Sequence, residues 1–315
     1  MIVIASLSAC SPAVRFLLYI DPYVIEVLEG QGIAASDIRQ SLSKDLNVRV
    51  EASALLVEET EALRRFDELI ERTNPDWVYL SPAHPFDPGA VIPRYPDVRF
   101  FREGNAGEGF AGENPGNQIA VVYDREKANY EAGGAIALLL GDKEFLKQIG
   151  AAGPVAGSPR VGILTAVLTE PVKREIAAFE EGFSQLADPK AISIKEIGNL
   201  TDRVKARRLL EGMREEAVAI VLLKTYVLSG FCLDYLSKEG GVAVVEGPIS
   251  DQAYGETVLL MLVDDFLGSL EQMAQYIDQE SPAGTDGLVS APVQLRWNQA
   301  YRSVVNTVIE GVDQQ

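Results

Sequence analysis

The stretch Leu7-Ser8-Ala9-Cys10 carries the most specific chemical signal in this chain. A small apolar residue, two small residues and a cysteine form the pattern of a bacterial lipobox, in which the cysteine is lipidated and becomes the mature N-terminus. The preceding segment is short and apolar, and it lacks the Lys or Arg that usually opens a secretory signal. We expect residues 1–10 to be a signal remnant with Cys10 as the lipidation site. The alternative is an apolar tail or an additional strand.

Few other side chains suit nucleophilic or metal chemistry. The chain has one histidine, His84, and two cysteines, Cys10 and Cys232. Cys232 lies in an apolar helical pattern, which favours a buried structural thiol over a nucleophile. One histidine and one available cysteine leave no zinc cluster and no Cys–His pair, and they argue against a Ser–His–Asp triad. We expect no metal, no cofactor and no catalytic residue, and this scarcity favours binding over catalysis.

Polar residues just beyond the expected strands are the candidates for ligand contact. In open parallel sheets, ligands bind outside the carboxyl ends of the strands. This rule selects Asp21, Tyr23, Ser81, His84, Asp124, Thr169, Glu170, Lys224, Tyr226, Glu246 and Asp251. Carboxylates accept hydrogen bonds from ligand hydroxyls, and tyrosine rings can stack on planar groups. For each residue the alternative is a helix cap or a solvated loop side chain.

Short apolar runs alternate with helical patterns, and these elements must position the candidates. We expect strands at residues 14–20, 47–56, 76–80, 98–102, 118–123, 160–166, 192–197, 217–223, 242–245, 258–263 and 288–291. We expect helices at residues 36–46, 57–72, 127–140, 171–187, 202–216, 229–237, 264–277 and 295–309. The alternation predicts an α/β fold with parallel sheets covered by helices on both faces, in two Rossmann-like lobes.

Composition restricts the class of protein further. Apolar residues make up 47% of the 315 residues, which is enough for a buried core. No apolar run reaches the ~20 residues that cross a bilayer, so a lipid on Cys10 would be the membrane attachment. The formal charge of −18 repels phosphate backbones and argues against nucleic acid as a partner.

Several segments resemble one family of bacterial lipoproteins. In Gln118 to Gly134, a strand is followed by a charged turn, an aromatic residue and Ala-Gly. Arg160 to Leu164 with Phe179 to Phe183, and Val245 to Gln252 with Val258 to Leu260, are similar to the second lobe of that family. The chain thus resembles the basic membrane lipoproteins, the PnrA-like nucleoside-binding lipoproteins of ABC transporters. Such proteins carry an N-terminal lipobox.

The resemblance implies a type I periplasmic-binding-protein fold. Two lobes would be joined by three crossing segments, with the ligand in the cleft between them and closure by a hinge motion. The crossings would lie near Asp124, between Gln252 and Leu259, and near 287–293. Lobe one would hold residues 14–124 and about 256–290, and lobe two would hold 125–255 and about 291–315.

The same comparison bears on the ligand. Ser250-Asp251-Gln252 matches a family motif whose aspartate binds ligand hydroxyls. Two features depart from the family pattern. The first strand leads to Asp21-Pro22-Tyr23 instead of a Ser-Phe-Asn-Gln stretch, and a family lysine falls near Asp264, which has the opposite charge. These departures concern the nucleoside ligand more than the fold.

The leading hypothesis is an extracytoplasmic, lipid-anchored solute-binding protein that captures a small polar molecule, such as a nucleoside, for an ABC importer. No bond would be broken, and closure would present both lobes to a permease or a sensor. One alternative is a ligand-sensing or structural surface lipoprotein without a permease. Another is an enzyme on the same fold, which would need Glu170 or Glu246 paired with a second carboxylate. No Gly-x-Gly-x-x-Gly follows the first strand to support a nucleotide enzyme.

Overall fold

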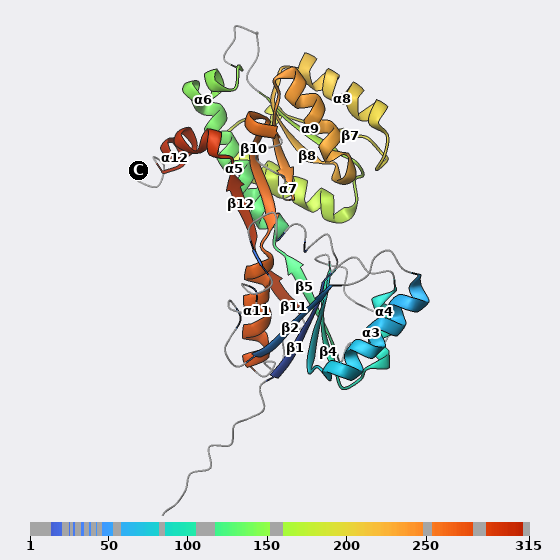
Figure 1. The fold of residues 1–315 in the computed structure, drawn as a ribbon. Coiled ribbons are helices and arrows are strands. Elements are labelled where there is room, and N and C mark those ends of the chain that lie inside the picture. The colour runs from blue at the N-terminus through green and yellow to red at the C-terminus, as the bar shows by residue number, and fades with distance from the viewer. Residues whose placement is uncertain are drawn as a thin grey trace, which may run out of the picture. The chain divides into compact units, whose positions relative to one another are not determined.

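The computed structural model divides the chain into two units, Met1–Tyr123 with Phe266–Ala291 and Asp124–Asp265 with Pro292–Gln315 (Figure 1). The structure describes residues 14–20, 46–52, 58–81, 86–104, 117–151, 160–247, 254–279 and 288–310, together with residues 25, 28, 33–34, 38 and 42. The chain passes from one unit to the other three times, after Tyr123, after Asp265 and after Ala291. No helix in the described ranges is both long enough and apolar enough to span a membrane.

The first unit is built on a parallel sheet with the strand order β11-β5-β4-β3-β1-β2. Its strands are β1 (Val14–Ile20), β2 (Leu46–Ala52), β3 (Trp77–Leu80), β4 (Arg99–Glu103), β5 (Gln118–Tyr123) and β11 (Leu288–Ala291). Its helical segments are α3 (Glu59–Thr73), α4 (Pro88–Val91), η1 (Ile92–Arg94) and α11 (Phe266–Asp278). Because all these strands run in one direction, their carboxyl ends share one edge of the sheet.

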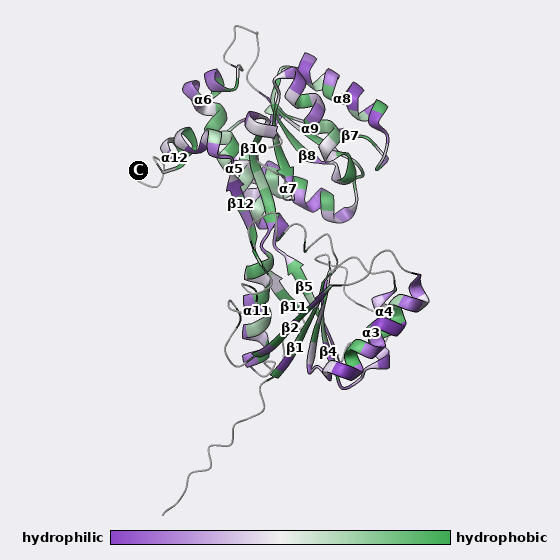
Figure 2. Cartoon of the chain, in the orientation of Figure 1, coloured by the Kyte–Doolittle hydropathy of each residue, from purple (hydrophilic) through white to green (hydrophobic). Residues whose placement is uncertain are grey.

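Both faces of the first sheet are buried, as expected for parallel strands. On one face, Leu17 and Val78 pack with Phe66 of α3 in a single apolar cluster. On the other face, Trp77 and Phe101 stack with ring centroids 4.8 Å apart. Successive residues of each strand therefore place their side chains on opposite faces of the sheet. Figure 2 shows the apolar strands against helices with a polar outer side, such as α3.

The second unit contains a six-stranded sheet with the order β12-β10-β9-β8-β6-β7. Its strands are β6 (Arg160–Thr165), β7 (Ile192–Glu196), β8 (Val218–Lys224), β9 (Val242–Glu246), β10 (Val258–Asp264) and β12 (Val293–Trp297). Its helical segments are α5 (Arg125–Gly141), α6 (Lys143–Gln148), α7 (Glu170–Ser184), η3 (Pro189–Ala191), α8 (Arg203–Glu215), η4 (Tyr226–Leu228), α9 (Ser229–Glu239), η5 (Gly255–Thr257), η6 (Gln299–Tyr301) and α12 (Arg302–Glu310). The strands pair in parallel except β12, which is antiparallel to β10.

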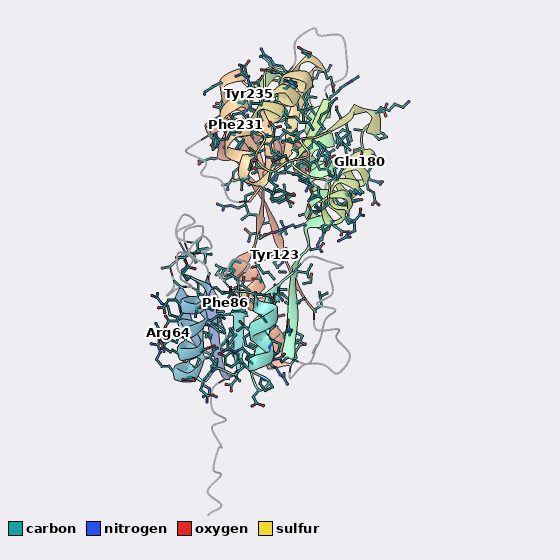
Figure 3. The ribbon with its side chains drawn as sticks, turned by 90° about the vertical axis from the view of Figure 1, so that its right-hand side faces the viewer. Arg64, Phe86, Tyr123, Glu180, Phe231 and Tyr235 are labelled. Atoms are coloured by element: carbon teal, nitrogen blue, oxygen red, sulfur yellow. The ribbon has the colours of Figure 1, made fainter. Side chains whose placement is uncertain are left out.

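Helices cover both faces of the second sheet. One core cluster joins the sheet to α5, α7 and α12, and another joins it to α8 and α9. Cys232 of α9 is buried in the latter cluster, which confirms the prediction of a buried thiol, and burial raises its pKa to about 11. Phe231 and Tyr235 of α9 (Figure 3) pack against the same cluster, and the guanidinium groups of Arg203 and Arg207 from α8 lie over their rings.

Helices α5 and α7 cross at two glycines. A Cβ atom on Gly133 would lie 2.2 Å from the carbonyl oxygen of Phe179, and one on Gly182 would lie 2.0 Å from that of Tyr130. No side chain fits at either position, so the glycines set how closely the two helices approach. This crossing fixes the position of α7, which carries Glu175 of the candidate site described below.

Two expectations from the sequence differ from the structure. Of the residues of about 256–290 expected in lobe one, Phe266–Ala291 belongs to the first unit, whereas β10 pairs with β9 and β12 in the sheet of the second unit. An apolar run shows that a strand is buried and does not show in which sheet. We also expected a helix over residues 295–309, whereas Val293–Trp297 is a strand and α12 begins at Arg302. The apolar residues Val293, Leu295 and Trp297 alternate with polar ones, which is the period of a strand.

Candidate functional site

Charged side chains gather where the strands of the second sheet end. Lys224 is the last residue of β8, Glu246 the last of β9 and Asp264 the last of β10. These three strands are neighbours and run parallel, so their ends share one edge. Helices that begin at this edge add Glu175 from α7 and Arg125 from α5. We call these five residues the charged edge of the second unit.

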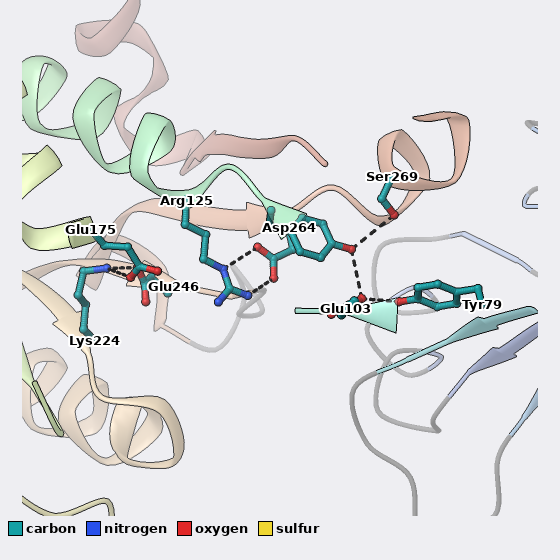
Figure 4. Close-up of polar contacts among 9 residues, drawn as sticks. Tyr79, Glu103, Arg125, Glu175, Lys224, Glu246, Asp264 and Ser269 are labelled. Carbon is teal, nitrogen blue, oxygen red and sulfur yellow. Dashed lines mark hydrogen bonds and ion pairs between the residues drawn. The ribbon is translucent and has the colours of Figure 1, made fainter. Parts of the chain in front are cut away.

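Lys224 lies at the centre of the charged edge (Figure 4). Its Nζ donates to Oε2 of Glu175 at 2.8 Å and also to Oε1 of Glu246. The side chains are 0%, 10% and 22% exposed, so the ammonium group is the most deeply buried of the three. Burial by itself lowers the pKa of Lys224, but the two carboxylates outweigh it and raise that pKa above its ordinary value. The group therefore stays a cation.

Arg125 and Asp264 form a second ion pair in the same unit (Figure 4). Nε and Nη2 of Arg125 donate to the two carboxylate oxygens of Asp264 at 3.2 Å and 2.6 Å. This is the two-pronged geometry in which arginine binds carboxylates most strongly. Burial lowers the pKa of Arg125, but the hydrogen bonds and charge of Asp264 raise it by more. Asp264 therefore neutralises Arg125, the first residue of α5, which explains an acidic residue at this position.

Tyr226 presents an aromatic ring beside this edge. It follows Lys224 by two residues, and 52% of its surface is exposed. Its backbone has a φ of 50°, a left-handed conformation that is uncommon for a bulky residue. Burial, followed by the negative charge of Glu246, raises the pKa of its hydroxyl. A half-exposed ring beside this edge offers a flat surface for stacking.

The charge balance of the edge determines which chemistry it suits. Arg125, Lys224 and Arg174 of α7 each contact a carboxylate of the same unit, Arg174 through Glu126 at 2.9 Å. Among the described residues, Oε2 of Glu246 has no hydrogen-bond partner. The edge can therefore accept hydrogen bonds from hydroxyl or amino groups, but its cations are already neutralised and do not favour an anion.

The first unit has a polar cluster at the corresponding edge of its own sheet. Glu103, the last residue of β4, accepts a hydrogen bond from Tyr79 of β3. The hydroxyl of Tyr123, at the end of β5, lies 3.4 Å from the same carboxylate and 3.5 Å from Oγ of Ser269 (Figure 4). Ser269 in turn donates to the carbonyl oxygen of Phe266 at 2.7 Å. A carboxylate between two tyrosine hydroxyls is again a hydrogen-bond acceptor.

The structure places some of the predicted residues together and others apart. Lys224, Glu246 and Tyr226 lie at one edge. Ser81 follows β3 in the first unit and is buried, and its amide donates to the carbonyl oxygen of Tyr19. The candidates Asp21, Tyr23, His84 and Asp251, and the lipidation site Cys10, lie outside the described residues.

Three other candidates occupy helix starts. Asp124 caps α5, where its side chain accepts a hydrogen bond from the amide of Lys127 at 3.1 Å. Thr169 holds the cap position of α7 without a side-chain cap bond. Glu170 is exposed and pairs with Lys173 at 2.6 Å. The side chains of Asp124 and Glu170 therefore have structural partners independent of any ligand.

The candidates chosen from the sequence do not include four residues that the structure brings to the two edges, namely Glu103, Arg125, Glu175 and Asp264. Glu103 and Asp264 directly follow the predicted strands 98–102 and 258–263, so the strand-end rule pointed to both positions. Glu175 had a signal of its own, because it lies on the apolar face of α7 between Val172 and Phe179. A carboxylate on an apolar helix face calls for a buried partner.

The described residues hold no group of three or more His, Cys, Asp or Glu side chains arranged to bind a metal ion.

No protein-family model matches this chain, and no curated protein matches it. Solved structures do match. A transcriptional activator of the comK gene from Bacillus halodurans is 18% identical with a TM-score of 0.60, and the alignment covers 94% of this chain and 96% of that one.

Two further matches are transport proteins. A periplasmic ribose ABC transporter from Conexibacter woesei is 15% identical with a TM-score of 0.59, covering 94% of this chain and 96% of that one. A solute-binding protein of an ABC transporter system from Aeropyrum pernix is 11% identical with a TM-score of 0.56, covering 95% and 80%. Together with the two sheets, these matches establish the α/β fold of type I periplasmic binding proteins.

Proposed function

We propose that this chain is a solute-binding protein that captures a small, uncharged, hydroxyl-rich molecule, such as a nucleoside or a sugar, for an ABC importer. The fold supports this role, because it is shared with solute-binding proteins of ABC transporters. One observation carries the choice of ligand. At the charged edge the described cations are neutralised by carboxylates, while Glu246 keeps an unpartnered oxygen.

Each residue of the edge has a role in this proposal. Oε2 of Glu246 accepts hydrogen bonds from neighbouring hydroxyls of the solute, which suits a diol. Lys224 holds the opposite oxygen of that carboxylate and so fixes its direction. Tyr226 stacks on a flat face of the solute, which is a common use of exposed tyrosine. In this role the chain binds and releases the solute without breaking a bond in it.

The finer parts of the proposal come from the sequence. We infer that Cys10 carries a lipid, that the chain works outside the cytoplasm, and that a permease or sensor reads its ligand-bound state. The resemblance to PnrA-like lipoproteins favours a nucleoside and adds Asp251 as a contact for its hydroxyls. Asp21, Tyr23 and His84 remain further candidates from the strand-end rule.

A thermal-shift screen with matched pairs of solutes tests the proposal. Each pair contains a neutral molecule and its phosphate: adenosine with adenosine monophosphate, ribose with ribose 5-phosphate, and galactose with galactose 1-phosphate. A bound solute stabilises the folded chain by about 2.7 kcal/mol at a hundred times its dissociation constant. We expect at least one neutral member to raise the unfolding temperature and its phosphate to do so less.

Two results would contradict the proposal. If the phosphates stabilise the chain more than their neutral partners, the charge balance of the edge does not determine the ligand. If no solute of a broad panel of nucleosides, sugars and amino acids raises the unfolding temperature, the chain is not a binding protein for small solutes. Intact-mass measurement of the membrane fraction tests the lipid separately, because an unmodified Cys10 excludes it.

A further inference from the structure

A hollow at the amino edge of the first sheet is lined by arginines and has no part in the proposed solute site. It has a volume of about 220 Å³. Its polar lining comes from Arg15, Asn47, Arg49, Arg72 and Thr73. Arg15 and Asn47 lie side by side near the starts of β1 and β2, and Arg72 and Thr73 end α3. The hollow therefore lies where the first two strands begin.

The arginines keep donors available for a ligand. Arg15 uses Nε and Nη2 on Asp76, and Arg49 uses Nε and Nη2 on Glu51. Arg72 makes a longer contact, with its Nη2 3.6 Å from the same oxygen of Glu51, and its side chain is 62% exposed. Among the described residues, the Nη1 groups of Arg15 and Arg49 have no partner. Counting only residues that the structure describes, three guanidinium groups share two carboxylates here, which leaves an excess of one positive charge in a chain of net charge −18.

Guanidinium groups with free N–H donors recognise phosphate oxygens through paired hydrogen bonds. We propose that this hollow binds the phosphate of an anionic phospholipid headgroup, so that the amino edge of the first unit rests on the membrane surface. The position of the proposed lipid anchor is the reason for choosing a phospholipid headgroup as the ligand of the hollow. Cys10 precedes the first residue of β1, Val14, by four residues, and a chain of that length spans at most about 14 Å.

This inference rests on the proposed lipid anchor, which keeps the hollow within reach of headgroups. A short tether raises the effective concentration of a second contact to the millimolar range, so a weak contact suffices. The acidic remainder of the chain opposes the approach only weakly, because charges more than ~8 Å from the membrane are largely screened at physiological ionic strength.

Vesicle binding by an unlipidated variant tests the hollow directly. In a Cys10→Ser background, binding is measured to vesicles of phosphatidylcholine and to vesicles that also contain phosphatidylglycerol. We expect binding only with phosphatidylglycerol, and a decrease of about fivefold in the partition coefficient for each arginine removed in Arg49→Gln and Arg72→Gln, from ~1 kcal/mol per basic residue at a membrane surface. The matched control is Arg207→Gln with Arg208→Gln on α8, which should bind as before.

Three outcomes overturn the proposal. Equal binding to both kinds of vesicle excludes headgroup recognition. Unchanged binding by the Arg49→Gln/Arg72→Gln variant shows that these arginines form surface ion pairs only. Stabilisation by inorganic phosphate without vesicle binding assigns the hollow to a free anion. The solute screen on the same variant keeps the two proposals separate, because loss of headgroup binding should leave solute stabilisation intact.

Discussion

Replacing Lys224 by methionine is the sharpest test of the charged edge. The substitution keeps the length of the side chain and removes the ammonium group that Glu175 and Glu246 share. Glu246 is 22% exposed and can regain water, whereas Glu175 is 10% exposed and is left as a nearly buried charge. Breaking a buried ion pair costs about 3–5 kcal/mol, and the partial exposure of Glu246 places this site near the lower value, about 3 kcal/mol.

The expected loss corresponds to a decrease of roughly 6–12 °C in the unfolding temperature of a unit of this size. The chain has two tryptophans, so a Trp77→Phe background leaves Trp297 of β12 to report on the second unit. Lys173→Met is the control, since Lys173 also pairs with a glutamate but in an exposed position, where an ion pair contributes little to stability. Adding Glu175→Gln to Lys224→Met should recover most of the stability. If Lys224→Met unfolds like Lys173→Met, or the double variant is no more stable than Lys224→Met alone, the cluster does not hold this edge together.

Three further predictions follow from the same structure. Glu246 and Glu175 raise the pKa of Lys224 above its ordinary value of 10.5, so the stability that the Lys224 ammonium group contributes is complete below pH 10.5 and is lost as the pH rises through the pKa of the folded state. The difference in urea midpoint between the wild type and Lys224→Met should therefore shrink above pH 10.5 and not below it. Gly182→Ala places a Cβ 2.0 Å from a carbonyl oxygen of α5 and should cost about 1–3 kcal/mol or more in urea unfolding, whereas Gly134→Ala, with its Cβ 3.6 Å from the nearest atom, should be neutral or stabilising; equal effects would refute the close crossing. Asp124→Ala removes the cap of α5 and should lower stability by about 1 kcal/mol while calorimetry shows unchanged solute affinity; a large loss of affinity would instead make Asp124 a ligand contact.

Hydrophobic periodicity was sufficient to predict most of the fold. The buried strands β1, β3, β8 and β9 are continuous apolar runs, and α7 shows its apolar face every three or four residues. These patterns depend on local sequence alone. The sheet to which β10 belongs depends on pairing with distant residues, which no local pattern encodes. The strand β12 was missed because it has only five residues and its alternating pattern leads through the cap residue Asn298 directly into a helical segment.

The candidate site was predictable in part for the same reason. The strand-end rule found Lys224 and Glu246, because parallel strands deliver their last residues to one edge. It could not show that Lys224 is buried and shared by two carboxylates, since Glu175 comes from a helix 49 positions earlier in the chain. Likewise the opposite charge of Asp264 is a departure from the family pattern in the sequence, and only the structure supplies its partner, Arg125.

Calorimetric titration of a Glu246→Gln variant tests the central claim most directly. The titrant is the neutral solute of the screen that stabilises the wild type most, among adenosine, ribose and galactose, with its phosphate titrated alongside. A hydrogen bond to a charged group is worth about 1.5–3 kcal/mol, so Glu246→Gln should weaken binding by roughly 10- to 100-fold, while Glu170→Gln, an exposed control, should bind like the wild type. An affinity of Glu246→Gln equal to that of the wild type, or tighter binding of the phosphate than of the neutral solute, would contradict the account.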